Sequence, residues 1–199
     1  MLTVLRDNFK KIIGGVASTL LKLHLTPSTI TVLGFCLAFI ASFFYAYPIV
    51  RWHQIVGALL FFVSGFCDVL DGSMARLGNQ TSKRGEFLDS ILDRYADVLV
   101  ITGITIFYGS MVTLTIPVYI WGFLAVSGSI LVSYARAKAE SLGVRLESVG
   151  FAERSERMFV IILLSFTPYL NWALIILACI THITVGQRII TAYHRLKVA

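Results

Sequence analysis

The stretch from Asp68 to Asp93 reads Asp-Val-Leu-Asp-Gly-Ser-Met-Ala-Arg, then eight residues, then Gly-Glu-Phe-Leu-Asp-Ser-Ile-Leu-Asp. Two aspartates three residues apart share one face of a helix, as do two that are four residues apart. The connection at residues 78–85 is short, which makes the two helices antiparallel neighbours. We therefore expect Asp68 and Asp71 to meet Asp89 and Asp93 at one end of a helical bundle.

The chain around this stretch has the composition of a membrane protein. Its residues are 57% hydrophobic and 14% charged, whereas a soluble domain is nearer half apolar and a quarter charged. A helix needs about 20 apolar residues to cross a bilayer. On that measure we expect an all-α integral membrane protein with six transmembrane helices at Ser28–Pro48, Gln54–Leu77, Glu86–Tyr108, Ile116–Glu140, Glu156–Leu170 and Trp172–Tyr193.

The first 24 residues have a different pattern, in which apolar side chains recur every three or four positions opposite charged ones. This is typical of an amphipathic helix that lies in the membrane interface. Charges run throughout this segment, so we expect no cleavable signal peptide. Six spans leave few residues for anything else. We therefore predict a single domain over residues 1–199, with an interfacial helix at 1–24 and a six-helix bundle at 28–193.

Basic residues gather at one end of the predicted spans, and only Arg51 falls on the other side. Lys and Arg accumulate on the cytoplasmic side of membrane proteins. We therefore expect a multi-pass protein of the cell membrane, with both termini and the aspartates in the cytoplasm. The same asymmetry explains the formal net charge of +6, so the charge indicates no nucleic-acid partner.

Four carboxylates gathered at membrane depth repel one another, and each is costly there. Two divalent cations would balance their charge. Ligand sets made of oxygen suit magnesium or manganese rather than zinc, and paired ions clamp phosphate oxygens during in-line displacement. The cysteines Cys36, Cys67 and Cys179 have no paired spacing, so we expect neither a disulfide framework nor a zinc site. The cluster predicts two magnesium or manganese ions and chemistry on phosphate.

Eight positions of the quoted stretch resemble the complete motif of the CDP-alcohol phosphotransferase family, at the family's spacing: Asp68, Asp71, Gly72, Ala75, Arg76, Gly85, Asp89 and Asp93. The resemblance covers the whole chain, because the family is similarly built from an interfacial helix and six spans, usually as a homodimer. It implies transfer of a phosphoalcohol from CDP-diacylglycerol or CDP-archaeol to a small alcohol, with release of CMP.

The resemblance also implies roles for individual residues. Asp68, Asp71 and Asp89 would bind metal, and Asp93 would contribute to the second ion and act as the base that takes the acceptor's hydroxyl proton. The spacing of the carboxylates alone leaves open which of them is the base. The CDP-lipid would be held by Asp68, Gly72, Ala75, Arg76 and Ser82, and by the turn of Thr29, Ile30, Thr31 and Val32.

Arg136, Arg154 and Arg188 come from the cytoplasmic ends of the last three spans. Such ends collect basic residues in any membrane protein, yet a basic residue that continues an apolar helix usually has a specific partner. Three guanidiniums suit an acceptor that carries phosphate. Segments 133–140 and 150–157 also resemble the branch of the family that makes phosphatidylinositol phosphate, or its archaeal ether-lipid counterpart. We therefore predict inositol 1-phosphate as the acceptor.

Several alternatives stay open at this point. Glycerol 3-phosphate would use the same chemistry, as in a phosphatidylglycerophosphate synthase. An ion-coupled transporter also carries buried aspartates, but its carboxylates would be spread across the membrane. A structural subunit gives no reason for four converging carboxylates. Asp97, one turn past Asp93, either tunes the site or pairs with an arginine, and Arg157 either assists the acceptor pocket or pairs with Glu153.

Overall fold

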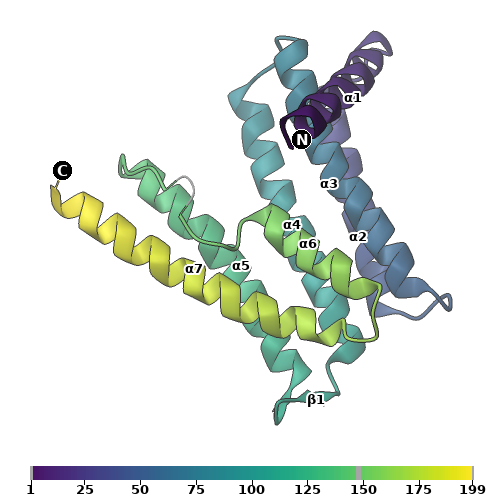
Figure 1. Ribbon diagram of the computed structural model, residues 1–199, viewed down its shortest axis with the longest axis vertical. Coiled ribbons are helices and arrows are strands. Elements are labelled where there is room, and N and C mark those ends of the chain that lie inside the picture. The colour runs from purple at the N-terminus through teal and green to yellow at the C-terminus, as the bar shows by residue number, and fades with distance from the viewer. Residues whose placement is uncertain (1, 147–148, 199) are drawn as a thin grey trace.

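The computed structural model describes residues 2–146 and 149–198, and the side chains among them from residue 11 to residue 197. These residues form helices and one short hairpin (Figure 1). The elements are α1 (Leu2–Lys22), α2 (Pro27–Ala46), α3 (His53–Leu77), α4 (Lys83–Tyr108), β1 (Val112–Thr113), β2 (Ile116–Pro117), α5 (Val118–Ser141), α6 (Arg154–Ser165) and α7 (Asn171–Val198). The predicted all-α class is confirmed.

Two helix starts at the same end of the bundle are fixed by capping side chains. The Thr29 amide donates to Thr26 Oγ1 over 3.3 Å at the start of α2, where proline occupies the first helical position. The Gly85 amide donates to Ser82 Oγ over 3.1 Å at the start of α4. Such caps satisfy amides that have no partner within the helix. They define where the chain enters both helices beside the end of α3.

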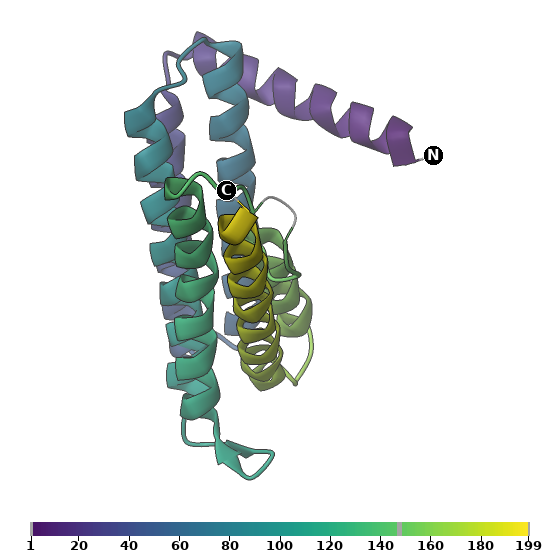
Figure 2. The same cartoon turned by 90° about the vertical axis from the view of Figure 1, so that its left-hand side faces the viewer.

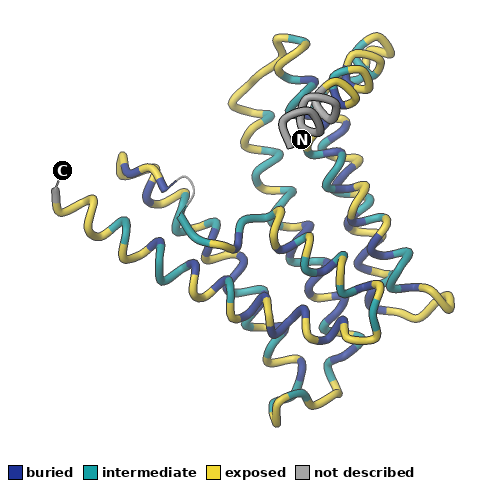
Figure 3. Tube along the Cα trace, in the orientation of Figure 1, coloured by how far each residue is buried: buried dark blue, intermediate teal, exposed yellow. Residues whose placement is uncertain are grey.

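The helices form two groups that share one core. Helix α2 packs against α3 and α4, while α5 packs against α7 and α4. Helix α6 lies between these groups and contacts both α3 and α7 (Figure 1). The buried residues lie where these helices face one another (Figure 3). The Tyr45 hydroxyl and Ser165 Oγ lie 2.9 Å apart, and this hydrogen bond joins α2 to the end of α6. The packing therefore brings α6 against α3, and the Arg157–Asp97 ion pair links the start of α6 to α4.

Helix α1 runs crosswise to the bundle at the end where α3 finishes and α4 begins (Figure 2). Ile13 and Ala17 are buried against Leu70 and Met74 of α3, whereas Ile12 is exposed. The helix is therefore attached to the bundle by one apolar face near the aspartates.

Within the part of the chain that the structure describes, four helices are long and apolar enough to cross a membrane: Pro27–Ala46, His53–Leu77, Val118–Ser141 and Asn171–Lys197. Helix α4 has 26 residues, but its first half is rich in charge. Helix α6 has 12 residues, which at 1.5 Å per residue is about 18 Å, shorter than a hydrocarbon core of about 30 Å. The six helices α2 to α7 thus occupy the predicted positions, and four of them have the length and composition of a span.

Candidate active site

Three of the four predicted aspartates come together where α3 meets α4. One carboxylate oxygen each from Asp68, Asp71 and Asp89 lies within 4.8 Å of the other two. The Thr31 hydroxyl donates to Asp71 Oδ2 over 2.6 Å. Asp89 Oδ1 is buried and has no hydrogen-bond partner among the described residues. A buried carboxylate oxygen without a partner is costly. This cluster therefore offers oxygen ligands to a cation, and a bound cation would offset the cost of burying the Asp89 oxygen.

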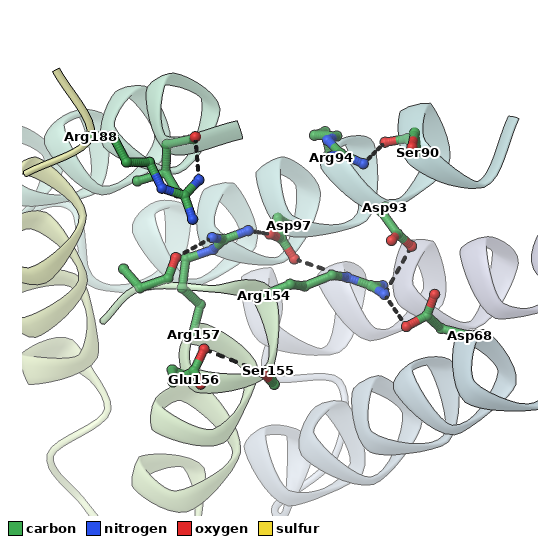
Figure 4. Close-up of polar contacts among 12 residues, drawn as sticks. Asp68, Ser90, Asp93, Arg94, Asp97, Arg154, Ser155, Glu156, Arg157 and Arg188 are labelled. Carbon is green, nitrogen blue, oxygen red and sulfur yellow. Dashed lines mark hydrogen bonds and ion pairs between the residues drawn. The ribbon is translucent and has the colours of Figure 1, made fainter. Parts of the chain in front are cut away.

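Asp93 is turned toward an arginine instead. Arg154 Nη1 lies 2.9 Å from Asp93 Oδ1 and 3.0 Å from Asp68 Oδ2 (Figure 4). Arg154 is the first residue of α6, so the contact of α6 with α3 brings a guanidinium to the carboxylates. A narrow space behind this contact is lined by all four aspartates together with Thr31 and Arg154. The arginine thus supplies positive charge between Asp68 and Asp93.

A first cavity of about 550 Å³ opens on one side of the cluster, between the starts of α2 and α4 and the end of α3. Asp71 and Asp89 line it. The predicted CDP-lipid residues that also line it are Thr31, Gly72, Ala75, Arg76 and Ser82. Gln80 and Lys83 lie there too, although the sequence did not single them out.

The remaining residues of the predicted turn point elsewhere. The Thr29 amide caps α2 through Thr26, Ile30 is buried against α1 and α3, and Val32 is exposed. None of the three is among the residues described as lining the first cavity. Because side chains rotate by about 100° per residue in a helix, one residue of this segment, Thr31, faces the aspartates.

A second cavity of about 360 Å³ lies on the other side of the cluster, and Asp68 and Asp93 line it. All three predicted acceptor arginines line it as well: Arg136, Arg154 and Arg188. Further charged residues not assigned to this cavity from the sequence are Arg94, Asp97 and Glu153. Residues from α3, α4, α5, α6 and α7 therefore surround one strongly charged pocket.

The three acceptor arginines differ in how firmly they are held. Arg188 is 2% exposed, and its Nε and Nη1 donate to the Val149 and Val132 carbonyls over 2.9 Å and 2.7 Å. Its Nη2 lies 3.8 Å from Glu153. Arg136 is more exposed and its Nε donates to Glu140 over 2.9 Å. Arg188 thus links the α5–α6 connection to α5, and its Nη2 lies near Glu153, which lines the second cavity.

Arg157 pairs with Asp97 of α4 rather than with Glu153. Its Nη2 donates to Asp97 Oδ2, and its Nη1 donates to the Ala152 carbonyl over 2.7 Å (Figure 4). Both side chains of the pair are buried. The expectation that Asp97 pairs with a nearby arginine is confirmed. Whether Arg157 pairs with Glu153 or with Asp97 depends on which face of α6 is turned toward α4. The spacing of residues along α6 alone does not predict which face this is.

Comparison with known proteins identifies relatives along nearly the whole chain. The family model described as CDP-alcohol phosphatidyltransferase matches residues 24–184. The archaetidylinositol phosphate synthase of Methanothermobacter thermautotrophicus is 39% identical over 99% of this chain and 96% of its own length. The synthase of the same name from Pyrococcus horikoshii is 34% identical over 99% of both chains.

Solved structures share the arrangement of the helices. Phosphatidylinositol phosphate synthase of Mycobacterium tuberculosis with CDP-DAG bound has a TM-score of 0.78 and 28% identity, covering 92% of this chain and 94% of that chain. The same enzyme in complex with manganese and citrate has a TM-score of 0.77 and 28% identity, covering 91% of this chain and 88% of that chain.

Proposed function

The chain belongs to the CDP-alcohol phosphatidyltransferase family, and on that basis we propose that it transfers the phosphatidyl-type group of a CDP-linked lipid to inositol 1-phosphate. It is a membrane enzyme of phospholipid biosynthesis, and the transfer releases CMP. The names of its relatives favour inositol phosphate over glycerol 3-phosphate as the acceptor. Family membership also removes the ion-coupled transporter from the alternatives.

The observation that carries this proposal is that two cavities meet at one aspartate cluster. Asp71 and Asp89 line the first cavity, while Asp68 and Asp93 line the second. An enzyme that moves a phosphate group between two molecules must hold both against the reacting phosphorus. In this arrangement the CDP moiety occupies the first cavity, beside Gly72 and Arg76, and the acceptor occupies the second.

The residues of the cluster fit divalent metal. Three carboxylate oxygens lie within reach of one cation, and the buried Asp89 oxygen has no other described partner. We assign Asp68, Asp71 and Asp89 to a first ion and Asp93, with part of this group, to a second. All-oxygen ligands suit magnesium or manganese. When bound, such ions neutralise phosphate charge as it develops.

The chain's own residues then carry the transfer. Asp93 takes the proton from the acceptor's hydroxyl group, and the resulting alkoxide attacks the lipid-side phosphorus. The bond from that phosphorus to the bridging oxygen of the diphosphate breaks, and CMP leaves. Arg76 and Ser82, which line the first cavity, hold the leaving nucleotide. Guanidinium is suited to bidentate contact with phosphate.

The second cavity suits an acceptor that itself carries phosphate. Arg136, Arg154 and Arg188 line it from three helices. Charge-assisted hydrogen bonds from guanidinium to phosphate are stronger than neutral ones, whereas free inositol or serine would leave these charges without an anionic ligand. Arg154 contacts Asp68 and Asp93 directly, so the acceptor phosphate would be bound next to the base.

We further propose that α2 to α7 all cross the membrane as one domain over residues 1–199, with α1 in the interface. Helix α6 is short, but it packs between α3 and α7, and irregular backbone is tolerated at membrane depth where protein surrounds it. Basic residues favour cytoplasmic termini. In the variant Arg51→Cys, the new cysteine should react with a membrane-impermeant thiol label on intact cells. In Lys197→Cys, the new cysteine should react with that label only after the cells are permeabilised. The reverse pattern would overturn this orientation.

The family resemblance supports a homodimer as the assembly. Light scattering on the detergent-solubilised protein, corrected for bound detergent, should give the mass of two chains. The mass of one chain would remove the dimer from the proposal.

Mass spectrometry of the lipid product tests the function. The purified protein is incubated with inositol 1-phosphate, with magnesium or manganese, and with either CDP-diacylglycerol or CDP-archaeol. The proposal expects a lipid that retains the inositol phosphate, formed in equal amount to CMP, with at least one lipid backbone. CMP without this lipid would indicate hydrolysis, and neither product in both backbones would refute the proposed reaction.

A further inference from the structure

Asp97 lies outside the eight-residue motif, yet it is among the most buried charged residues that the structure describes, with 4% of its surface exposed. Its two carboxylate oxygens face two different arginines of α6. Oδ2 accepts from Arg157 Nη2, and Oδ1 lies 3.8 Å from Arg154 Nε (Figure 4). A buried carboxylate is costly unless it is paired, and one arginine would already balance its charge. The contact with the second arginine therefore calls for another explanation.

Arg157 is the fixed member of this group. It is 4% exposed, and its Nη1 also donates to the Ala152 carbonyl, just before α6 begins. Residues three apart lie on the same side of a helix, so Arg154 and Arg157 both face α4. The Asp97–Arg157 pair thereby fixes the first turn of α6 against α4, and with it the position from which Arg154 extends.

Arg154 has two ends with different neighbours. Its Nη1 reaches Asp68 and Asp93, which line the second cavity, while its Nε faces Asp97. Asp68 and Asp93 are assigned above to metal. Once they bind metal, Asp97 is the carboxylate among the described contacts of Arg154 that stays available to hold the guanidinium at the cavity wall, with Nη1 directed to the acceptor phosphate.

We propose that Asp97, braced by Arg157, is a positioning residue that sets the place of Arg154 for binding the phosphorylated acceptor. The proposal rests on the acceptor role of Arg154 in the proposed function. It places a determinant of acceptor affinity on α4, one turn beyond the motif.

The first test compares Asp97→Asn, Arg154→Ala and the double variant in steady-state CMP release. We expect Asp97→Asn to raise the KM for inositol 1-phosphate about tenfold, the size of a coupling of about 1.4 kcal/mol, and to leave the KM for the CDP-lipid unchanged. In the Arg154→Ala background the same change should add nothing to the acceptor KM. An equal effect in both backgrounds would show that Asp97 does not act through Arg154.

Glu156→Gln is the matched control. Glu156 is an exposed acid between the two arginines in the sequence, and its carboxylate accepts from Ser155. The change removes the same negative charge as Asp97→Asn does, but from the first turn of α6 instead of from α4. Both KM values should stay at the wild-type level; a raised acceptor KM here would mean that net charge, not position, controls acceptor binding.

Asp97→Asn leaves Arg157 without its carboxylate, so the variant is at risk of unfolding. A second variant, Asp97→Leu with Arg157→Met, replaces the pair by apolar side chains, a change that is often neutral for stability. We expect a wild-type thermal midpoint and a raised acceptor KM. A wild-type KM in this variant would reduce the pair to a structural role. Failure of the proposed function would appear in the wild type, as no CMP release with inositol 1-phosphate, whereas failure of this inference appears only in the variants.

Discussion

Replacing Arg154 by alanine removes the guanidinium that lies between Asp68 and Asp93. In the proposed mechanism this guanidinium binds the acceptor phosphate in the second cavity. Arg154 is not among the residues described as lining the first cavity, so the change should separate the two substrates. We expect the KM for the acceptor to rise and the KM for the CDP-lipid to stay close to its wild-type value.

The magnitude follows from the contacts. A hydrogen bond to a charged group contributes about 1.5–3 kcal/mol, which corresponds to a rise of about tenfold to about 150-fold in the acceptor KM. Arg154 also faces three carboxylates, with Nη1 at 3.0 Å from Asp68 and 2.9 Å from Asp93. Once the Arg154 guanidinium is removed, its positive charge no longer offsets the repulsion among these carboxylates. The metal-free variant should therefore unfold at a lower temperature, and magnesium or manganese should restore the midpoint.

The assay is CMP release by detergent-purified protein, with each substrate varied at a saturating level of the other. Arg145→Ala is the matched control, because Arg145 is an exposed arginine of the α5–α6 connection, which precedes Arg154, and is not among the residues described as lining either cavity. It should leave both KM values unchanged. Equal rises of the two KM values in Arg154→Ala would refute the acceptor role and leave Arg154 as a structural residue.

Further predictions concern the base, the metal and the packing of the helices. Asp93→Asn should lower turnover by about 10²–10⁴-fold, the usual contribution of a general base, at an unchanged thermal midpoint; substantial remaining turnover would exclude Asp93 as the base. Chelation should stop CMP release and magnesium or manganese should restore it, and a chelator-resistant enzyme would contradict the metal assignment. Gly103→Ala would bring a Cβ within 2.4 Å of the Ser42 carbonyl. It should therefore destabilise the α2–α4 contact by about 1–3 kcal/mol, seen as a lower midpoint, while an unchanged midpoint would mean that the two helices separate easily.

The positions of the helices and the meeting of α3 with α4 could be predicted from the sequence, because they depend on local patterns. Apolar runs located α2 to α7, and the spacing of Asp68, Asp71 and Asp89 placed their carboxylates together. The end of α6 is less well predicted, since the apolar pattern extends the span to Leu170 whereas the helix ends at Ser165. Pro168 carried the signal, because proline lacks the amide that a continuing helix needs.

The contacts of the arginines could not be predicted, because they depend on how distant helices pack. Arg154 is 61 residues from Asp93 in the chain, and nothing in either local pattern reports that α6 turns this side chain between Asp68 and Asp93. Arg188 was expected to face a ligand, yet two of its nitrogens donate to backbone carbonyls. Sequence patterns therefore identified the three acceptor arginines of the second cavity but not Arg94, Asp97 and Glu153, and packing decided the partners of all of them.

The most direct test of the two-cavity account is CMP release by the wild-type protein with a CDP-lipid and magnesium, compared across inositol 1-phosphate, glycerol 3-phosphate, inositol and serine. Release with inositol 1-phosphate and not with inositol would support a second cavity that recognises phosphate through Arg136, Arg154 and Arg188. Release with glycerol 3-phosphate alone would keep the chemistry and change the acceptor. Equal release with free inositol or serine would contradict the account, because those acceptors have no phosphate for the arginines to bind.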